Sequence, residues 1–280
     1  MMGAHHAACG AAAWLAVTTR VHIDLASVTG GSLPWAGDLG SGLMPVSPGL
    51  ALVGAVVCAG AAMLPDADHS EATIAHSLPP LSNVVCAGVG AVSGGHRHGT
   101  HSILGIAVFT MLAWVASLWT IPFHGFGNVH VGEGLAAMIL GAFAAKALKI
   151  IPDSMRRTPW LTGALFGALI ALLPTLAPVH GPQWWFPAAV ALGAVVHILG
   201  DMLTTGGVNL IWPFVARPPK PVTRIPALEK VWMPNGYMAV PVLGNAGSWR
   251  EWCFLVPIAA YSLYTAAVTA WALRPAPFWF

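Results

Sequence analysis

Charged side chains are too scarce in this chain to cover the surface of a soluble domain. The 280 residues include 12 Lys+Arg and 10 Asp+Glu, so that 8% are charged, whereas soluble domains have about 25%. Hydrophobic residues make up 56%, and a soluble fold would need a charged exterior around such a core. The composition also excludes a disordered chain and a coiled coil. It predicts an integral membrane protein, and the net charge of +2 is too small to indicate a nucleic-acid partner.

Long apolar runs predict about seven transmembrane helices and hence an all-α fold embedded in a lipid bilayer. A helix needs about 17–25 apolar residues to cross a hydrocarbon core about 30 Å thick. Gly and Ala inside the runs suit close helix packing in lipid. A shorter run, 81–93, predicts a re-entrant or half-buried helix. The seven runs are 3–19, 46–64, 103–123, 134–151, 160–179, 185–203 and 252–273.

Basic residues distinguish the two faces of such a protein. Seven spans place the N-terminus on the same face as segments 65–102, 152–159 and 204–251, which hold eight of the 12 basic residues. Lys146 and Lys149, near the same end of the fourth run, can snorkel to this face and bring the number to ten. Only Arg20 and Arg274 lie on the other face. The positive-inside rule therefore predicts a multi-pass protein of the cell membrane, with a cytoplasmic N-terminus and an external C-terminus. The ten residues are Arg97, Lys146, Lys149, Arg156, Arg157, Arg217, Lys220, Arg224, Lys230 and Arg250.

One long polar connection, residues 206–250, interrupts the apolar pattern. A loop of this length inside a compact protein is usually functional or disordered, and we interpret it as a folded cytoplasmic cap. Asn235-Gly236 between apolar flanks is typical of a hairpin turn, although Pro234 disfavours a regular strand. No internal repeat is evident, so the chain is predicted to be a single transmembrane domain, 1–280.

Metal-capable side chains concentrate in four places, and the predicted topology puts all four at the cytoplasmic face. Intramembrane clusters of ionisable residues are usually functional. Any one of these histidines alone would more often be an interfacial or hydrogen-bonded residue. The joint occurrence on one face favours a metal site. The four groups are His5-His6; Asp66, Asp68 and His69; His96, Arg97 and His101; and His197 with Asp201.

The spacing within two of these groups suits metal ligation. His197 and Asp201 are one helical turn apart, so both side chains lie on the same face, about 6 Å apart along the axis. Asp66 and Asp68 follow Pro65, and a tight turn there can direct both carboxylates at one site. Imidazole together with carboxylate suits Zn, Mn or Fe.

These motifs resemble those of the YdjM-type inner-membrane metal-dependent hydrolases, which are also labelled LexA-binding. The resemblance rests on Leu64-Pro65-Asp66-Ala67-Asp68-His69, on the block from His96 to Ser102, and on His197-Ile198-Leu199-Gly200-Asp201 with Thr204 to Val208 and Trp212-Pro213 after it. The N-terminal histidine of the family pattern matches His6 better than His5. His98 departs from the pattern, where the family has Gly. The match runs from residue 3 to about 215.

The resemblance implies a membrane-bound, metal-dependent hydrolase, and the residues suggest how it works. Seven ligand candidates exceed what one ion takes from protein, which favours one or two divalent ions, Zn or Mn in preference. The metal would activate a water at the cytoplasmic face, Asp68 or His69 would be the general base, and Arg97 would stabilise negative charge. A site level with the lipid headgroups suggests a lipid-linked ester as substrate, and Arg97 favours a phosphate ester. The ligand candidates are His6, Asp66, Asp68, His96, His101, His197 and Asp201.

A divalent-metal or proton-coupled transporter is the alternative. Acids and histidines inside helices also form ion pathways. A transporter usually places such residues near the bilayer midplane, in broken helices of related halves. Here they lie at helix ends on one face, which favours the hydrolase. The lipid bilayer and a lipid-linked substrate are the partners we expect, with no nucleic acid, while the sequence leaves the oligomeric state open.

Overall fold

The computed structural model shows a mostly helical protein. It describes the chain except for residues 29, 125–126, 153, 156, 177–181 and 275–280, so that Arg156, from the charge count above, and the C-terminus lie outside the described residues. The helices are α1 (Gly3–Thr18), α2 (Leu25–Val28), α3 (Pro48–Ala61), α4 (Leu81–Val92), α5 (Ile103–Leu118), α6 (Val131–Ala147), α7 (Thr158–Leu176), α8 (Trp185–Met202), α9 (Lys220–Thr223), α10 (Pro226–Val231) and α11 (Trp249–Trp271), with 3-10 helices η1 (Leu64–Asp68), η2 (Thr73–His76) and η3 (Gly99–His101).

Each of the seven apolar runs in the sequence overlaps one of the long helices. Among the described residues, three segments are long and apolar enough to cross a membrane: Pro48–Asp68, Trp185–Met202 and Trp249–Trp271. The remaining apolar helices are shorter or less apolar, so the crossing of all seven runs stays a prediction. Large apolar side chains remain exposed on α5 and α11, for example Leu112 at 59% and Leu263 at 74%. Such surfaces suit a lipid environment rather than water.

Local sequence signals set where several helices begin. Ser47, Ser102 and Ser248 each cap the first turn of a helix, with the hydroxyl oxygen accepting from the backbone N–H of Leu50, Gly105 and Glu251 respectively. A serine cap satisfies one of the backbone donors that the first turn leaves free. The predicted short helix at 81–93 is α4. Pro65 begins the tight 3-10 turn that carries the two aspartates.

Helix α3 lies at the centre of the bundle, where it packs against α1, α6, α8 and α11. The close approach of these helices depends on glycine. A Cβ on Gly10 of α1 would lie 2.7 Å from the Cys58 carbonyl oxygen of α3, and a Cβ on Gly193 of α8 would lie 2.6 Å from the same atom. Both helices can therefore contact the α3 backbone directly. This packing carries the histidines of α1 and α8 to the same end of α3.

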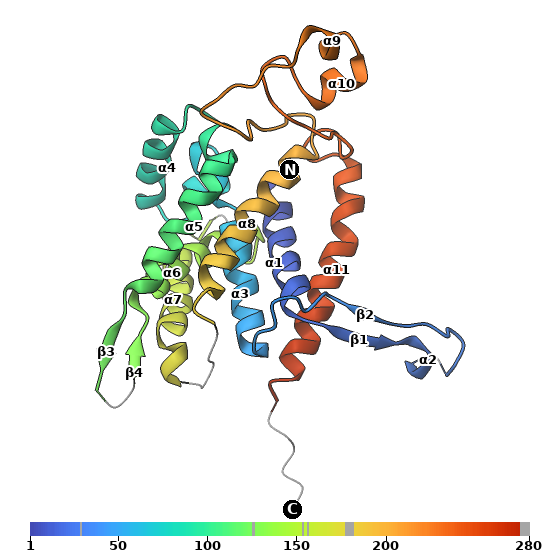
Figure 1. Cartoon of the computed structure of the whole chain (residues 1–280). Coiled ribbons are helices and arrows are strands. Elements are labelled where there is room, and N and C mark those ends of the chain that lie inside the picture. Colours follow the sequence, from blue (N-terminus) through green and yellow to red (C-terminus); the bar gives the residue numbers. More distant parts are fainter. Residues whose placement is uncertain (29, 125–126, 153, 156, 177–181, 275–280) are drawn as a thin grey trace, which may run out of the picture.

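The strands are confined to two small antiparallel hairpins, which the hydropathy pattern did not predict. They are β1 (Val21–Asp24) with β2 (Ala36–Leu39), and β3 (Ile121–Phe123) with β4 (Gly127–Val129). Both hairpins lie at one end of the helices, whereas the N-terminus, α9 and α10 lie at the opposite end (Figure 1). Helix α11 runs between the two ends.

Residues 206–248 form a cap at the end that carries the N-terminus. The cap contains α9 and α10 and a reverse turn in which the Gly236 N–H donates to the Met233 carbonyl at 2.8 Å. Trp232 and Met238 pair through a single antiparallel bridge. The expected hairpin is thus represented by one bridge around the Asn235-Gly236 turn, and the described residues of the cap contain no extended strand.

Candidate metal centre

Two buried histidines face each other at the cap end of the bundle. The Nε2 atoms of His101, from η3, and His197, from α8, lie 3.2 Å apart, and both residues are fully buried. The Nδ1 of His197 lies 2.6 Å from the Ala62 carbonyl oxygen, which can only accept. The Nδ1 of His101 lies 3.3 Å from an Asp68 oxygen. These partners assign the ring protons to Nδ1, so that two Nε2 lone pairs point into the same space.

Two carboxylates complete a set of four donor atoms. Asp66 Oδ1 lies 3.7 Å from His101 Nε2 and 3.6 Å from His197 Nε2. Asp201 Oδ2 lies 3.6 and 3.8 Å from the same nitrogens. Ligands bonded to one tetrahedral ion at about 2.0–2.2 Å are about 3.3–3.6 Å from each other. Each carboxylate, together with the two Nε2 atoms, therefore makes a donor set whose spacing and chemistry fit a divalent metal, which would also separate the facing lone pairs.

Asp68 is oriented differently from Asp66 and holds the surrounding groups in place. One oxygen lies 2.9 Å from His96 Nδ1, and the other accepts from the Thr100 hydroxyl at 2.5 Å and the Arg97 backbone N–H at 3.1 Å. A carboxylate bonded to the Nδ1 of a histidine leaves the Nε2 free for a metal. Asp68 thus orients both His96 and His101.

The N-terminal helix reaches the cluster through His6. Its ring stacks on that of His197 with centroids 3.7 Å apart, and its Nε2 lies 3.2 Å from Asp201 Oδ1. Neither nitrogen of this buried ring makes a hydrogen bond of good geometry to the described residues. The same Asp201 oxygen lies 2.5 Å from the Met1 ammonium. His5 instead points away and bonds Glu251.

Arg97 occupies the edge of the cluster in a left-handed backbone conformation with φ of 65°. Such a conformation is uncommon outside glycine and is held by its surroundings. The Asp68 carboxylate accepts from its N–H, and its carbonyl accepts from the Asn209 N–H at 3.1 Å. The guanidinium then reaches Asp201 Oδ2 at 3.2 Å and the Gly207 carbonyl at 3.2 Å. The bent backbone therefore aims the cation at the same carboxylate that faces the histidines.

The cluster is closed toward the helices and open on the side of His96. The His96 side chain is 37% exposed, whereas those of His101 and His197 are 0% exposed. His69 packs edge-on against His96, with ring centroids 4.6 Å apart, and its Nδ1 accepts from the Glu71 N–H. An open side is what distinguishes catalytic from purely structural metal sites.

The cap borders this open side. The Tyr237 hydroxyl lies 3.1 Å from His98 Nδ1, and the Val208 N–H donates to Met238. His98 is half-buried beside Tyr237. Partial burial also raises the pKa of the Tyr237 phenol above its ordinary value, because the charged form loses hydration.

The structure brings together all of the ligand candidates that the sequence singled out. They form three overlapping groups whose ligand atoms lie within 4.8 Å of one another: His6, His197 and Asp201; Asp66, His101 and His197; and Asp68, His96 and His101. These buried His and Asp groups could hold a metal ion. His69 lies beside the cluster and belongs to none of the three groups.

Sequence reasoning missed three residues that shape the site. Thr100 lies within the His96 to Ser102 motif, and its hydroxyl donates to Asp68. Glu251 is a fully buried acid at the start of an apolar helix. An acid in such an apolar stretch is costly to bury, and this cost could have indicated that Glu251 has a role. Gly206 lies so close to Arg97 that a Cβ there would be 1.9 Å from the Arg97 Nη1 atom. No local sequence signal indicates this last contact.

Together these features define a helical membrane protein with a cluster of histidines and aspartates at one end of its bundle. The family model for the YdjM inner membrane protein matches residues 1–272. The chain therefore belongs to the YdjM family of inner membrane proteins, and the resemblance inferred from the motifs is confirmed. Neither the curated proteins nor the solved structures contained a match.

Proposed function

We propose that the protein is a membrane-bound, metal-dependent hydrolase that cleaves a lipid-linked phosphoester at the cytoplasmic face. The observation that carries the proposal is the convergence of His101, His197, Asp66 and Asp201 on one space, within 3.2–3.8 Å of one another for the measured pairs. A mixed imidazole and carboxylate set favours Zn or Mn. The open side near His96 leaves room for substrate.

The residues would divide the work according to their contacts. His101, His197, Asp66 and Asp201 would hold one ion, while His6 and His96 would complete the set or hold a second. A bound divalent ion supplies Lewis acidity toward the phosphoryl group and makes water a stronger acid. Asp68 acts as the orienting carboxylate, because its oxygens face the Nδ1 atoms of His96 and His101 rather than their free Nε2 atoms.

The remaining residues provide the proton transfer and charge stabilisation. His69 is half-buried at the open side, which suits a general base better than the saturated Asp68. The water oxygen bonds to phosphorus as the P–O ester bond breaks. His69 accepts one proton from the water and donates it to the departing alkoxide. Arg97 lies next to Asp201 and can hold a phosphoryl oxygen through its guanidinium.

The proposed orientation of the protein in the membrane is supported by the basic residues at the end that carries the cluster. The N-terminus and the basic cap lie together, at the opposite end from both hairpins (Figure 1). The excess of Arg and Lys in this part of the chain supports a cytoplasmic location for the cluster. A site at that depth would meet the headgroup region of the inner leaflet, where lipid phosphates lie.

The test is hydrolysis by purified protein in detergent, loaded with Zn or Mn, on a panel of phospholipids and polyprenyl phosphates. We expect release of phosphate or headgroup by the wild type and a loss of about 10³-fold or more in Asp66→Ala and His197→Ala, because chemistry would lose its metal. The matched control is His22→Ala, which breaks an exposed His–Asp pair in the β1–β2 hairpin. Metal uptake into proteoliposomes without hydrolysis would instead establish the transporter.

A further inference from the structure

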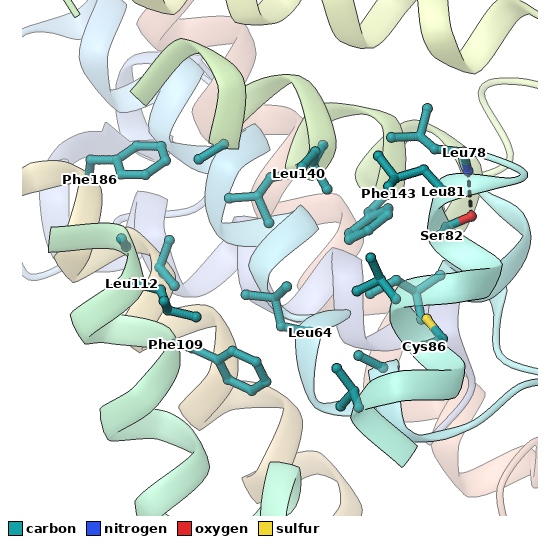
Figure 2. A pocket seen from close by; sticks show the side chains of 18 residues that line it. Leu64, Leu78, Leu81, Ser82, Cys86, Phe109, Leu112, Leu140, Phe143 and Phe186 are labelled. Carbon is teal, nitrogen blue, oxygen red and sulfur yellow. Dashed lines mark hydrogen bonds between the residues drawn. The ribbon is translucent and has the colours of Figure 1, made fainter. Parts of the chain in front are cut away.

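An apolar cavity lies beside the metal centre and is not used by the chemistry above. Its volume is about 360 Å³, within the range of about 300–1,000 Å³ that small-molecule pockets occupy. Side chains from η1, α4, α5, α6 and α8 line it. Figure 2 shows Leu64, Cys86, Phe109 and Leu140 turned toward the same space from four of these elements.

The lining is almost entirely hydrocarbon. The only hydroxyl is that of Ser82, and it is already used: it donates to the Ala75 carbonyl at 2.7 Å and accepts from the Leu78 N–H at 3.0 Å. A polar ligand or a cluster of waters would find no partner there, and burying an unpaired polar group is costly. The chemistry of the lining therefore selects an apolar chain.

The wall of the cavity formed by α4 and α5 is exposed on the outside of the bundle. Three of its lining residues are well exposed on the outer surface: Leu81 at 46%, Val85 at 50% and Leu112 at 59%. Leu81 and Val85 belong to α4, and Leu112 belongs to α5. A hydrocarbon chain could thus enter between α4 and α5 from lipid without crossing water.

The inner end of the cavity lies next to the metal centre. Ala67 lines the cavity and lies between Asp66 and Asp68 in the 3-10 turn, so that consecutive residues of η1 contact the two spaces. On the α4 side, Val89 lines the cavity and the neighbouring Gly90 contacts the Asp68 backbone, where a Cβ would lie 3.0 Å from the carbonyl oxygen. One molecule could therefore place its headgroup at the aspartates and its tail in the cavity.

We infer that this cavity binds the hydrocarbon chain of the lipid substrate. The inference rests on the proposed hydrolase function, which it deepens: the substrate is a phosphate ester of a long alkyl or isoprenoid chain. The chain enters between α4 and α5 and its phosphate meets Arg97 and the His/Asp cluster. Part of the substrate's binding energy then comes from burial of its apolar chain.

Binding can be measured without turnover. The probe is hexadecyl phosphate with a diazirine at mid-chain, photolysed with the full-length, chelator-treated protein in detergent. We expect labelled peptides from α4 and α5 at the cavity wall. Filling the cavity with Ala113→Phe, or from the α6 wall with Ala136→Phe, should lower this labelling about tenfold. The matched control is Ala107→Phe, on the exposed face of α5 and outside the cavity. Thermal melting and metal content verify that each variant folds.

Hydrolysis assays separate this inference from the proposed function. We expect Ala113→Phe to lose hydrolysis of hexadecyl phosphate about tenfold while keeping that of p-nitrophenyl phosphate, which has no chain to bind. Labelling confined to the cavity in a protein that hydrolyses neither compound would refute the hydrolase and leave the chain-binding site standing. Labelling spread along the exposed face of α5, or equal labelling of both Phe variants and wild type, would overturn the cavity assignment. Loss of labelling with unchanged hexadecyl phosphate hydrolysis would equally overturn it.

Discussion

The Nε2 atoms of His101 and His197 lie 3.2 Å apart, although each ring carries its proton on the opposite nitrogen. Two buried lone pairs at this distance repel one another, and no solvent screens them because both side chains are 0% exposed. A cation between the rings turns this repulsion into two favourable contacts. The relationship explains why these two histidines, out of 12 in the chain, are the ones that we place at the centre of the site.

Metal binding should stabilise the fold measurably. An ion that binds only the folded protein, present at 100 times its Kd, adds about 2.7 kcal/mol to the free energy of unfolding. We expect chelator-treated protein in detergent to melt at a lower temperature and to recover when Zn or Mn is added. His197→Ala should melt at the same temperature with and without metal, while His22→Ala should respond like wild type. An equal response of His197→Ala and wild type would contradict the assigned ligand.

Asp68→Asn should weaken metal binding although Asp68 is assigned no bond to the ion. The amide cannot accept simultaneously from Thr100, the Arg97 N–H and both rings, so His96 and His101 lose their orientation. Loss of such outer partners typically costs about 10–100-fold in metal affinity. Competition with a fluorescent chelator measures the affinity. Asp38→Asn, which removes the exposed partner of His22, is the control and should not change it.

The sequence predicts this fold well where the signal is local. Apolar runs predict the helices because a helix in lipid needs apolar side chains over a continuous stretch of sequence. Ser47, Ser102 and Ser248 predict where three helices begin, because each caps its helix through a contact within one turn. The two hairpins carry no comparable signal, because their strands have only three or four residues. Each hairpin lies in a connection between two helices, from α1 to α3 or from α5 to α6.

The candidate site likewise contains features that the local sequence predicts and features that only the folded chain shows. His197 and Asp201 share a helix face, so their pairing follows from a spacing of four residues. The role of Asp68 could not be separated from that of Asp66, because only the folded chain shows that Asp68 turns toward Nδ1 atoms and Asp66 toward Nε2 atoms. The contact between Gly206 and Arg97 joins residues more than 100 positions apart, and no periodicity encodes it.

Gly206→Ala should impair catalysis while leaving metal binding intact. The added Cβ would lie 1.9 Å from the Arg97 Nη1 atom, so the guanidinium must leave its place beside Asp201. A donor that stabilises developing negative charge contributes about 10²–10³ to kcat, and we expect a loss of about tenfold or more. Gly88→Ala, where nothing lies within 4 Å of the new Cβ, is the matched control. Full activity of Gly206→Ala would remove Arg97 from the mechanism.

The buried contact between Glu251 and His5 should contribute to stability rather than to metal binding. Glu251 also accepts from the Met2 N–H at 2.8 Å and the Gly247 N–H at 2.7 Å, which joins α11 to the start of α1. Removing one member of a buried pair costs about 3–5 kcal/mol. We expect Glu251→Ala to unfold at markedly lower denaturant concentration, with Glu229→Ala on the exposed cap as control. A double variant with His5→Ala should lose less than the sum of the single losses.

The sidedness of the cluster can be tested through single added cysteines. From the charge distribution we expect the cap inside the cell and both hairpins outside, and Figure 1 shows the cap and the β1–β2 hairpin at opposite ends of the helices. In intact cells, a membrane-impermeant maleimide should therefore label Ala36→Cys in β2 and not Glu229→Cys in α10. Inverted membrane vesicles should show the reverse. The unmodified chain controls for reaction at its native cysteines, of which Cys253 is exposed. Labelling of Glu229→Cys in intact cells would place the His/Asp cluster on the external face and exclude a substrate in the cytoplasmic leaflet.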